Sequence, residues 1–160
     1  MSRPQLVWFK RDLRLTDHQP LVEALRRGPC IFLYIYEPEL LAADDHDPSH
    51  VAYINDCLSD LHASLRARGG ALTLRHGPAE VVLAALHRDH QFEATYSHQE
   101  TGNQLTYQRD TRVKRWTKAV GIPWHEFRQH GVVRGLKNRD GWAKQWNQMM
   151  ARPLVRTPQA

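Results

Sequence analysis

Two stretches of this chain are apolar almost without interruption, and they restrict the possible folds more than any other feature. Residues 6–9 read LVWF within a strand expected at 5–10, and residues 30–36 read CIFLYIY. Such runs are typical of strands buried on both faces, as in a parallel sheet with helices on each side. The continuous run at 30–36 predicts a central strand.

Helical and strand patterns alternate along the rest of the chain. Helices are expected from Asp17 to Gly28, from Asp47 to Gly69, from about 79 to 89, and from Thr101 to Gly121. The carboxylates of Asp17 and Asp47, and a Thr101–Gln104 capping box, are expected to cap three of these helices. Further strands are expected at 71–76, 94–97 and 122–127, with the first of these near an edge.

This alternation predicts βαβ units with right-handed crossovers, and therefore a three-layer α/β fold around a doubly wound, Rossmann-like sheet of five parallel strands. The pattern changes after residue 128, where glycines interrupt a basic and aromatic segment with one short helix at about 140–150. We therefore expect an α/β domain at 1–128 and an irregular connector at 129–160.

Composition agrees with one domain of ordinary size, since 41% of the 160 residues are hydrophobic and 24% are charged. No apolar run approaches the ~20 residues that span a bilayer, and no segment of signal-peptide type precedes the first strand. The expectation is a cytoplasmic protein with no membrane partner. Cys30 and Cys57 are expected to be small core residues of a reduced protein. The net charge of +5 permits a polyanionic partner without identifying one.

A charged cluster follows the first strand directly, at the place where an open parallel sheet has its ligand crevice. The cluster comprises Lys10, Arg11, Asp12, Arg14 and Asp17. These charges either line a pocket or form ion pairs that fasten the strand end to a neighbouring helix.

Other patterns that carry chemistry are weak in this chain. Glycine-rich phosphate loops and a Gly-x-Ser-x-Gly elbow do not occur. His98 and Glu100 follow the fourth strand, where they could act as a base and an acid, or serve only as caps and ion-pair partners. The acidic run at 44–47 could hold a divalent ion, but it is better explained as a polar loop ending in a helix cap.

The segment WFKRDLRLTD (8–17) resembles the amino-terminal signature of the DNA photolyase and cryptochrome family. The segment VAYINDCLSDL (51–61) and the pair Arg109-Asp110 fit the same family. The resemblance extends over roughly the whole chain. It implies the strand order 3-2-1-4-5 and an amino-terminal α/β domain that hosts an antenna chromophore, namely a folate, a deazaflavin or FMN.

In this family, light energy passes from the antenna to FAD in a separate helical domain, and the reduced, excited FAD splits pyrimidine dimers in DNA. The resemblance therefore implies that FAD and DNA are bound through the full-length protein, with the helical domain as partner. Whether this chain is itself an enzyme stays open. The alternative is a stand-alone α/β module that binds a nucleotide or flavin, or docks a protein.

Five positions match the chromophore crevice of the family. Lys10 and Arg11 match the basic side of the crevice, and Tyr34 matches an aromatic residue that stacks on the ring, although it would serve equally well as a core aromatic. Gln99 stands where crevice binders carry an acid, and Glu100 would supply that carboxylate one position later. An antenna site needs a flat apolar slot with a few orienting polar groups, and it needs no group with a tuned pKa.

Overall fold

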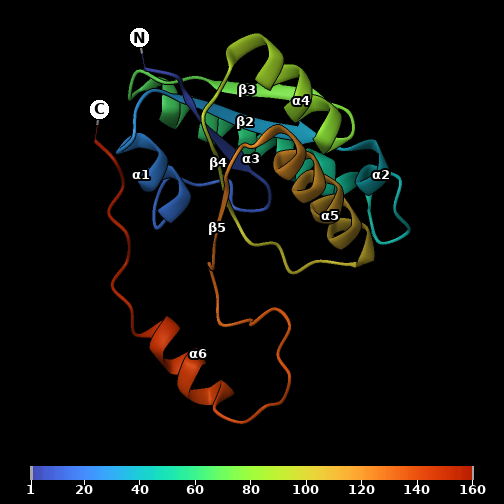
Figure 1. Ribbon diagram of the computed structural model, residues 1–160, viewed down its shortest axis with the longest axis vertical. Helices are drawn as coiled ribbons and strands as arrows, with labels where there is room; N and C mark the ends of the chain where they lie inside the picture. The colour runs from blue at the N-terminus through green and yellow to red at the C-terminus, as the bar shows by residue number, and fades with distance from the viewer. Residues whose placement is uncertain (1, 160) are drawn as a thin grey trace.

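The computed structural model describes residues 2–159 and contains a five-stranded, all-parallel sheet in the order β3-β2-β1-β4-β5 (Figure 1). The expected strand order is thus confirmed, with β1 in the middle and β3 at an edge. The strands are β1 (Gln5–Phe9), β2 (Cys30–Tyr36), β3 (Leu72–His76), β4 (Thr95–His98) and β5 (Trp124–Phe127).

Helices cover both faces of this sheet, as the expected three-layer fold requires (Figure 1). Helices α1 and α3 pack on one face, and α4 and α5 pack on the other. The helices are α1 (Gln19–Leu25), α2 (Pro38–Leu41), α3 (Pro48–Arg66), α4 (Ala79–His90), α5 (Gln104–Val120) and α6 (Trp142–Met150).

Strand β1 shows why the sheet must be covered twice. Val7 and Phe9 belong to the core beneath α1 and α3, whereas Leu6 and Trp8 belong to the core beneath α4 and α5. All four side chains are at most 1% exposed. Because successive side chains of a strand point to opposite faces, this apolar run is stable only between two helical layers.

Two of the expected helix caps are wrong, and the third is confirmed. Helix α1 is capped by His18, whose Nδ1 accepts from the Leu21 N–H, while Asp17 lies one residue outside with a positive φ of 49°. Asn103 rather than Thr101 caps α5. Asp47 caps α3 as expected. The two errors have one cause, since Asp17 and Thr101 are engaged by residues more than 25 positions away in sequence.

A short helix, α2, occupies part of the stretch that the sequence predicts to be a loop. Pro38 begins it, in keeping with the fixed φ of proline at a first helical position. The chain after α2 continues into α3, and both helices contribute side chains to the cavity described below.

The segment after β5 forms a C-terminal arm (residues 128–159) that leaves the sheet, carries α6 away from the other helices and returns toward α1 (Figure 1). Gly131 lies so close to Trp146 that a Cβ would stand 2.1 Å from the indole Cδ1, so only glycine fits beneath this ring. The arm is fastened at its end, where the Val155 N–H donates to Asp17 Oδ1 at 2.9 Å and Arg68 donates to the Pro158 carbonyl at 3.3 Å.

Among residues 2–159, no helix combines the length and apolar character that crossing a bilayer demands.

Candidate functional site

A cavity of about 590 Å³ opens at the carboxyl ends of β1 and β2. The strand order reverses direction between β1 and β4, and the crevice outside such a reversal is where open α/β sheets bind ligands. One wall is largely apolar and comes from the β-strands and α3, with Phe9, Tyr34, Ile54 and Cys57. The opposite wall is charged.

Four of the five expected site residues line this one cavity: Lys10, Arg11, Tyr34 and Glu100. Gln99 lines instead a smaller neighbouring hollow of about 220 Å³, which also touches Lys10, Arg11 and Glu100. Gln99 therefore lies beside the main crevice and not in its wall, and Glu100 lines both hollows.

The two basic residues after β1 point in different directions. The Arg11 side chain is 67% exposed, and its Nε lies 3.1 Å from Glu100. Arg11 therefore both lines the cavity and forms an ion pair with the residue after β4. The ammonium of Lys10 is buried over the rings of Trp8 and Trp124 and lies 3.7 Å from Asp110. Burial lowers the pKa of Lys10, and the Asp110 carboxylate opposes that shift.

Tyr34 is part of the apolar wall of the cavity. Its side chain is 8% exposed and packs edge-on against Tyr36, with ring centroids 5.1 Å apart. Burial raises the pKa of Tyr34, so the phenol is neutral at physiological pH. The residue is both a core aromatic and part of the cavity wall.

Arg109 is the centre of the charged wall. It is 1% exposed, reaches out from α5 and forms ion pairs with Glu37 and Glu100, and its Nε donates to Asp110 at 2.8 Å. The three carboxylates come from the end of β2, the end of β4 and α5, so one guanidinium joins three elements. Bidentate and multiple hydrogen bonds of this kind are the particular ability of arginine.

This network shifts the pKa values of its members. Burial raises the pKa of Glu37 to about 7, with a further increase from Glu100, although Arg109 opposes it. Burial alone would lower the pKa of Arg109, but Glu37 and Glu100 outweigh it and raise that pKa. Arg109 is therefore charged, and its carboxylate partners balance it.

Sequence reasoning singled out Arg109-Asp110 only as a family feature. An arginine at a position with helical apolar spacing was the available signal. Its partners in β2 and β4 are distant in sequence, so only the tertiary structure identifies them.

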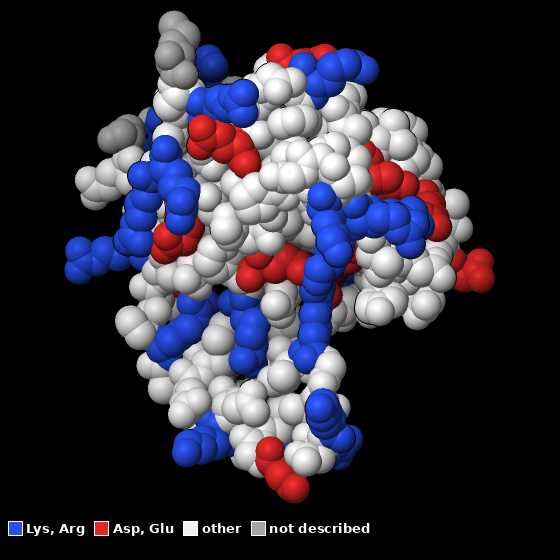
Figure 2. Space-filling view, viewed as in Figure 1, with Lys and Arg blue, Asp and Glu red and all other residues white. Residues whose placement is uncertain are grey.

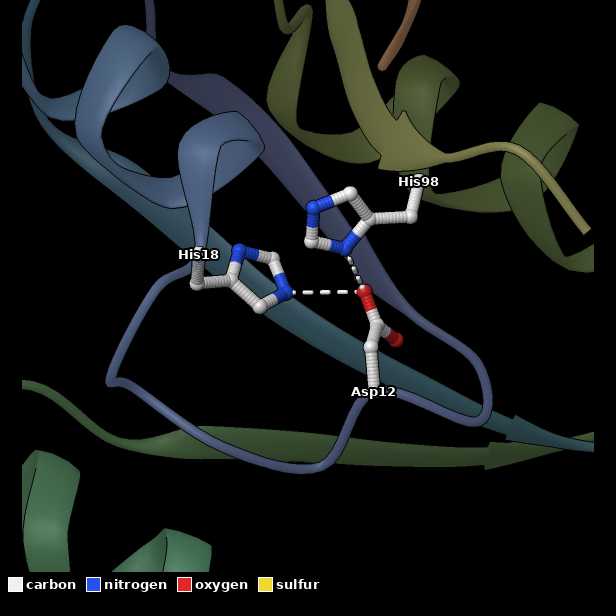
Figure 3. Close-up of side chains that lie close together, drawn as sticks. All are labelled: Asp12, His18 and His98. Carbon is white, nitrogen blue, oxygen red and sulfur yellow. Dashed lines mark hydrogen bonds and ion pairs between the residues drawn. The ribbon is translucent and has the colours of Figure 1, made fainter. Parts of the chain in front are cut away.

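A second buried cluster lies behind the cavity and joins Asp12, His18 and His98 (Figure 3). Asp12 Oδ2 accepts from His18 Nε2 at 2.8 Å and from His98 Nδ1 at 2.6 Å, while Oδ1 accepts from the Lys10 N–H at 2.7 Å. Burial alone would raise the pKa of Asp12, but the hydrogen bonds from the two imidazoles hold it well below its usual range. The cluster ties the loop after β1 to the start of α1 and the end of β4.

The same three residues bring potential metal ligands within 4.8 Å of one another. However, Nδ1 of His18 accepts from the Leu21 N–H at 3.1 Å, so the proton of the neutral ring sits on Nε2. That nitrogen donates to Asp12 and has no lone pair to offer a metal ion. Hydrogen bonds to Asp12 therefore hold the three side chains together, and within residues 2–159 the buried Nε2 of His98 has no hydrogen-bond partner.

His98 and Glu100, the pair that could have been a base and an acid, are both held by structural partners. His98 is bound to Asp12, and Glu100 is bound to Arg109 and Arg11. The Arg134 guanidinium of the arm also donates to the Glu100 carbonyl and to Asp110 Oδ2, the latter at 3.0 Å. These contacts make the charged wall a rigid frame around an apolar slot.

The fold defines the chain as a doubly wound α/β domain with a cavity at the switch point of its sheet. A family model described as DNA photolyase matches residues 5–141, which is most of the chain. The chain belongs to the DNA photolyase family and corresponds to the N-terminal domain of photolyases and cryptochromes.

Individual relatives agree. The deoxyribodipyrimidine photo-lyase of Synechococcus sp. is 32% identical over 123 residues, which cover 76% of this chain and 25% of that protein. The deoxyribodipyrimidine photo-lyase of one strain of Thermus thermophilus is 38% identical over 126 residues, which cover 76% of this chain and 27% of that protein. The chain thus spans about a quarter of the length of these curated relatives.

Solved structures show the same fold. A bacterial class III photolyase from Agrobacterium tumefaciens has a TM-score of 0.81 at 24% identity, covering 99% of this chain and 34% of that one. An archaeal photolyase from Sulfolobus tokodaii has a TM-score of 0.78 at 20% identity, covering 98% and 37%. That photolyase was solved with two FAD molecules and is described as implying a novel light-harvesting cofactor.

Proposed function

We propose that this domain holds a planar antenna pigment in the crevice at the ends of β1 and β2, and that the pigment passes its excitation to FAD elsewhere in the full-length protein. The observation that carries the proposal is the single cavity of about 590 Å³ that joins Lys10, Arg11, Tyr34 and Glu100 at the switch point of the sheet. A volume of several hundred Å³ with an apolar wall and a few fixed polar groups suits a drug-sized planar ligand.

The residues around the crevice fit a flavin, a deazaflavin or a folate ring in their general chemistry. The apolar wall offers Tyr34 for stacking, and the charged wall offers Glu37 and Glu100 as acceptors for ring N–H groups. Arg11 and Arg14 stand at the same cavity and can meet anionic groups of a side chain. The archaeal photolyase, which was solved with two FAD molecules and is described as implying a novel light-harvesting cofactor, supports a flavin-type pigment.

We further propose that residues 1–128 form the pigment domain and that the connector after it leads to the helical FAD domain. In this proposal the exposed side chains of α6 face that domain, with Trp142 at 41% and Met150 at 47% exposure. The light-driven repair of pyrimidine dimers, or blue-light sensing, then belongs to the complete protein, and DNA binds through its other part.

Binding of a coloured pigment by the purified chain tests the proposal. The purified chain is titrated with riboflavin, FMN and a reduced folate, and the absorption spectrum of the protein fraction is recorded after gel filtration. At least one of these should co-elute in a one-to-one complex. Ile54→Trp, which fills the apolar wall, should abolish uptake, whereas the control Val81→Trp, at a side chain 58% exposed on α4, should leave it unchanged.

The outcomes separate the candidate functions. Tight binding of ATP with no uptake of any pigment would favour the nucleotide-binding module. Pigment uptake that persists in Ile54→Trp would move the site away from this crevice.

A further inference from the structure

The ammonium of Lys10 is held in an unusual way. Its Nζ lies 4.7 Å from the ring centroid of Trp8 and 5.3 Å from that of Trp124, so it sits against two indoles at once. Within residues 2–159 it has no hydrogen-bond partner, and its nearest carboxylate is Asp110 at 3.7 Å. Burying an ammonium without hydrogen bonds is costly, and attraction to the faces of the two rings offsets part of that cost.

A second cation lies against the same indole pair. The guanidinium carbon of Arg109 is 4.9 Å from the centroid of Trp8. The two indoles are themselves neighbours, with centroids 5.9 Å apart and ring planes 35° from parallel. Trp8 therefore has two positive groups against its ring and a second tryptophan beside it.

One indole of this pair, that of Trp8, borders the pigment crevice. Trp8, Lys10 and Arg109 all line the cavity of about 590 Å³. Indole is the most easily oxidised of the ordinary side chains, and a photoexcited flavin-type pigment is a strong one-electron oxidant. If an electron moves from the indole to the excited pigment, the indole becomes a radical cation, and the return of the electron releases the excitation as heat. An antenna with such a neighbour loses its excitation before it can transfer it.

We propose that Lys10 and Arg109 act as an electrostatic guard on Trp8 and Trp124, which resists their one-electron oxidation and so preserves the excitation of a pigment in the crevice. The physical reason is Coulomb repulsion, because a positive charge about 5 Å from a ring opposes the formation of a second positive charge on it, most strongly in a site with little water. This inference rests on the proposed function. It gives a function to the buried ammonium of Lys10, whose position hydrogen bonding does not explain.

Fluorescence lifetime of a bound probe tests the guard. Riboflavin is the probe, and the lifetime of the protein-bound fraction is measured in the wild-type chain and in Lys10→Met, which keeps the length of the side chain and removes its charge. We expect the lifetime to shorten by roughly twofold or more in Lys10→Met, because electron transfer from Trp8 is no longer opposed. Lys10→Met/Trp8→Phe should restore it, since the electron donor is gone. Lys118→Met, at an exposed position of α5, is the matched control and should leave the lifetime unchanged.

A purely structural role predicts a different pattern. In that case Lys10→Met would change the melting temperature and leave the lifetime of the bound probe as it was, and this result would overturn the proposal. A shortened lifetime that Trp8→Phe fails to restore would also overturn it, because the quencher would be another group. If Lys10→Met does not fold, Lys10→Gln replaces it in the same comparison.

A second measurement keeps the guard testable if riboflavin does not bind. The chain is irradiated with free riboflavin in solution, and oxidation of each tryptophan is quantified by peptide mass spectrometry. The ratio of Trp8 oxidation to oxidation of the exposed Trp142 should be several-fold higher in Lys10→Met than in the wild type. Equal ratios would overturn the proposal whether or not the crevice takes a pigment.

Discussion

Asp12 illustrates how one side chain organises the region beside the crevice. It accepts three hydrogen bonds, from the backbone N–H of Lys10 and from the rings of His18 and His98. His98 is 2% exposed, and burial lowers its pKa, although the hydrogen bond to Asp12 opposes the shift. The folded protein thus keeps an imidazole neutral where the unfolded chain readily protonates it.

This arrangement predicts that stability depends on pH through His98. Below the ordinary histidine pKa of 6.5, the unfolded chain binds a proton at position 98 that the folded chain does not, so the contribution of His98 to the free energy of unfolding falls as the pH falls from 7 to 5. Glu37, whose pKa is raised to about 7 by burial, contributes in the opposite direction, so the slope of His98 is read from the comparison with a variant. His98→Asn keeps a donor for Asp12 and cannot titrate, so it should lose part of this slope. Urea unfolding at pH 7, 6 and 5 measures the slope in both proteins. His62→Asn, at an exposed position of α3, serves as the control, and equal slopes in wild type and His98→Asn would contradict the expectation.

Single residues were also where sequence reasoning reached its limit. The Asp47 cap was predictable because the backbone N–H groups that donate to its carboxylate lie two and three residues away. Asp17 was mistaken for a cap because its partner is Val155, which no local pattern reveals. Lys10 and Arg11 were found because they directly follow a strand end of a parallel sheet, and Tyr34 was found through the family resemblance. The guard on Trp8 was not found, since it depends on where the Lys10 side chain turns.

At the scale of elements, the local sequence pattern predicted the helices and strands, but it did not predict the ion pairs that join them. All five strands, the four helices that cover the sheet and the short helix α6 were expected within a few residues, because buried runs and amphipathic faces are local features. Arg109 then joins α5 to the ends of β2 and β4 through Glu37 and Glu100. Such a buried ion network combines residues up to 72 positions apart, and it decides the geometry of the crevice wall.

Removal of Arg109 should therefore be severe. Arg109→Met leaves Glu37 and Glu100 buried without their main cation, and breaking a buried pair in this way costs about 3–5 kcal/mol of unfolding free energy. Arg115→Met, at an exposed position of the same helix, should change stability by less than about 0.5 kcal/mol. Adding Glu37→Gln to Arg109→Met should recover part of the loss, because one of the stranded charges disappears. Chemical unfolding followed by circular dichroism measures all three, and an Arg109→Met protein as stable as Arg115→Met would refute the role of this network.

Charge is distributed unevenly between the two parts of the molecule, and the overall composition does not show this. Residues 1–127 carry fifteen basic and sixteen acidic side chains, whereas residues 128–159 carry seven basic and one acidic. Figure 2 shows this as a predominance of blue over the lower part of the molecule, where the arm lies. The net charge of +5 therefore comes from the arm, because acidic residues match basic residues in number up to β5 and do not do so beyond it.

The arm is held to the body through few contacts, and Asp17 provides most of them at its far end. Its Oδ1 accepts from the Val155 N–H at 2.9 Å, its Oδ2 lies 3.4 Å from Arg152, and its own N–H donates to the Val155 carbonyl at 3.2 Å. Because Asp17 has a φ of 49°, glycine can replace it without backbone strain, and only the side-chain contacts are then lost.

Asp17→Gly should consequently release the end of the arm while the sheet stays intact. Losing one hydrogen bond and a partly buried ion pair costs about 1–1.5 kcal/mol of local opening free energy, so amide exchange at Val155 should become about tenfold faster. Exchange at core amides of β1, and the melting temperature, should change little, because the arm contributes little to either apolar core. Asp17→Asn is the matched control, since it keeps the acceptor oxygen and tolerates the same backbone conformation. Hydrogen exchange read by mass spectrometry gives the answer: if exchange at Val155 is as slow in Asp17→Gly as in the wild type, the arm is held by contacts other than Asp17. A rise at β1 and Val155 together would mean that the arm and the sheet unfold as one unit.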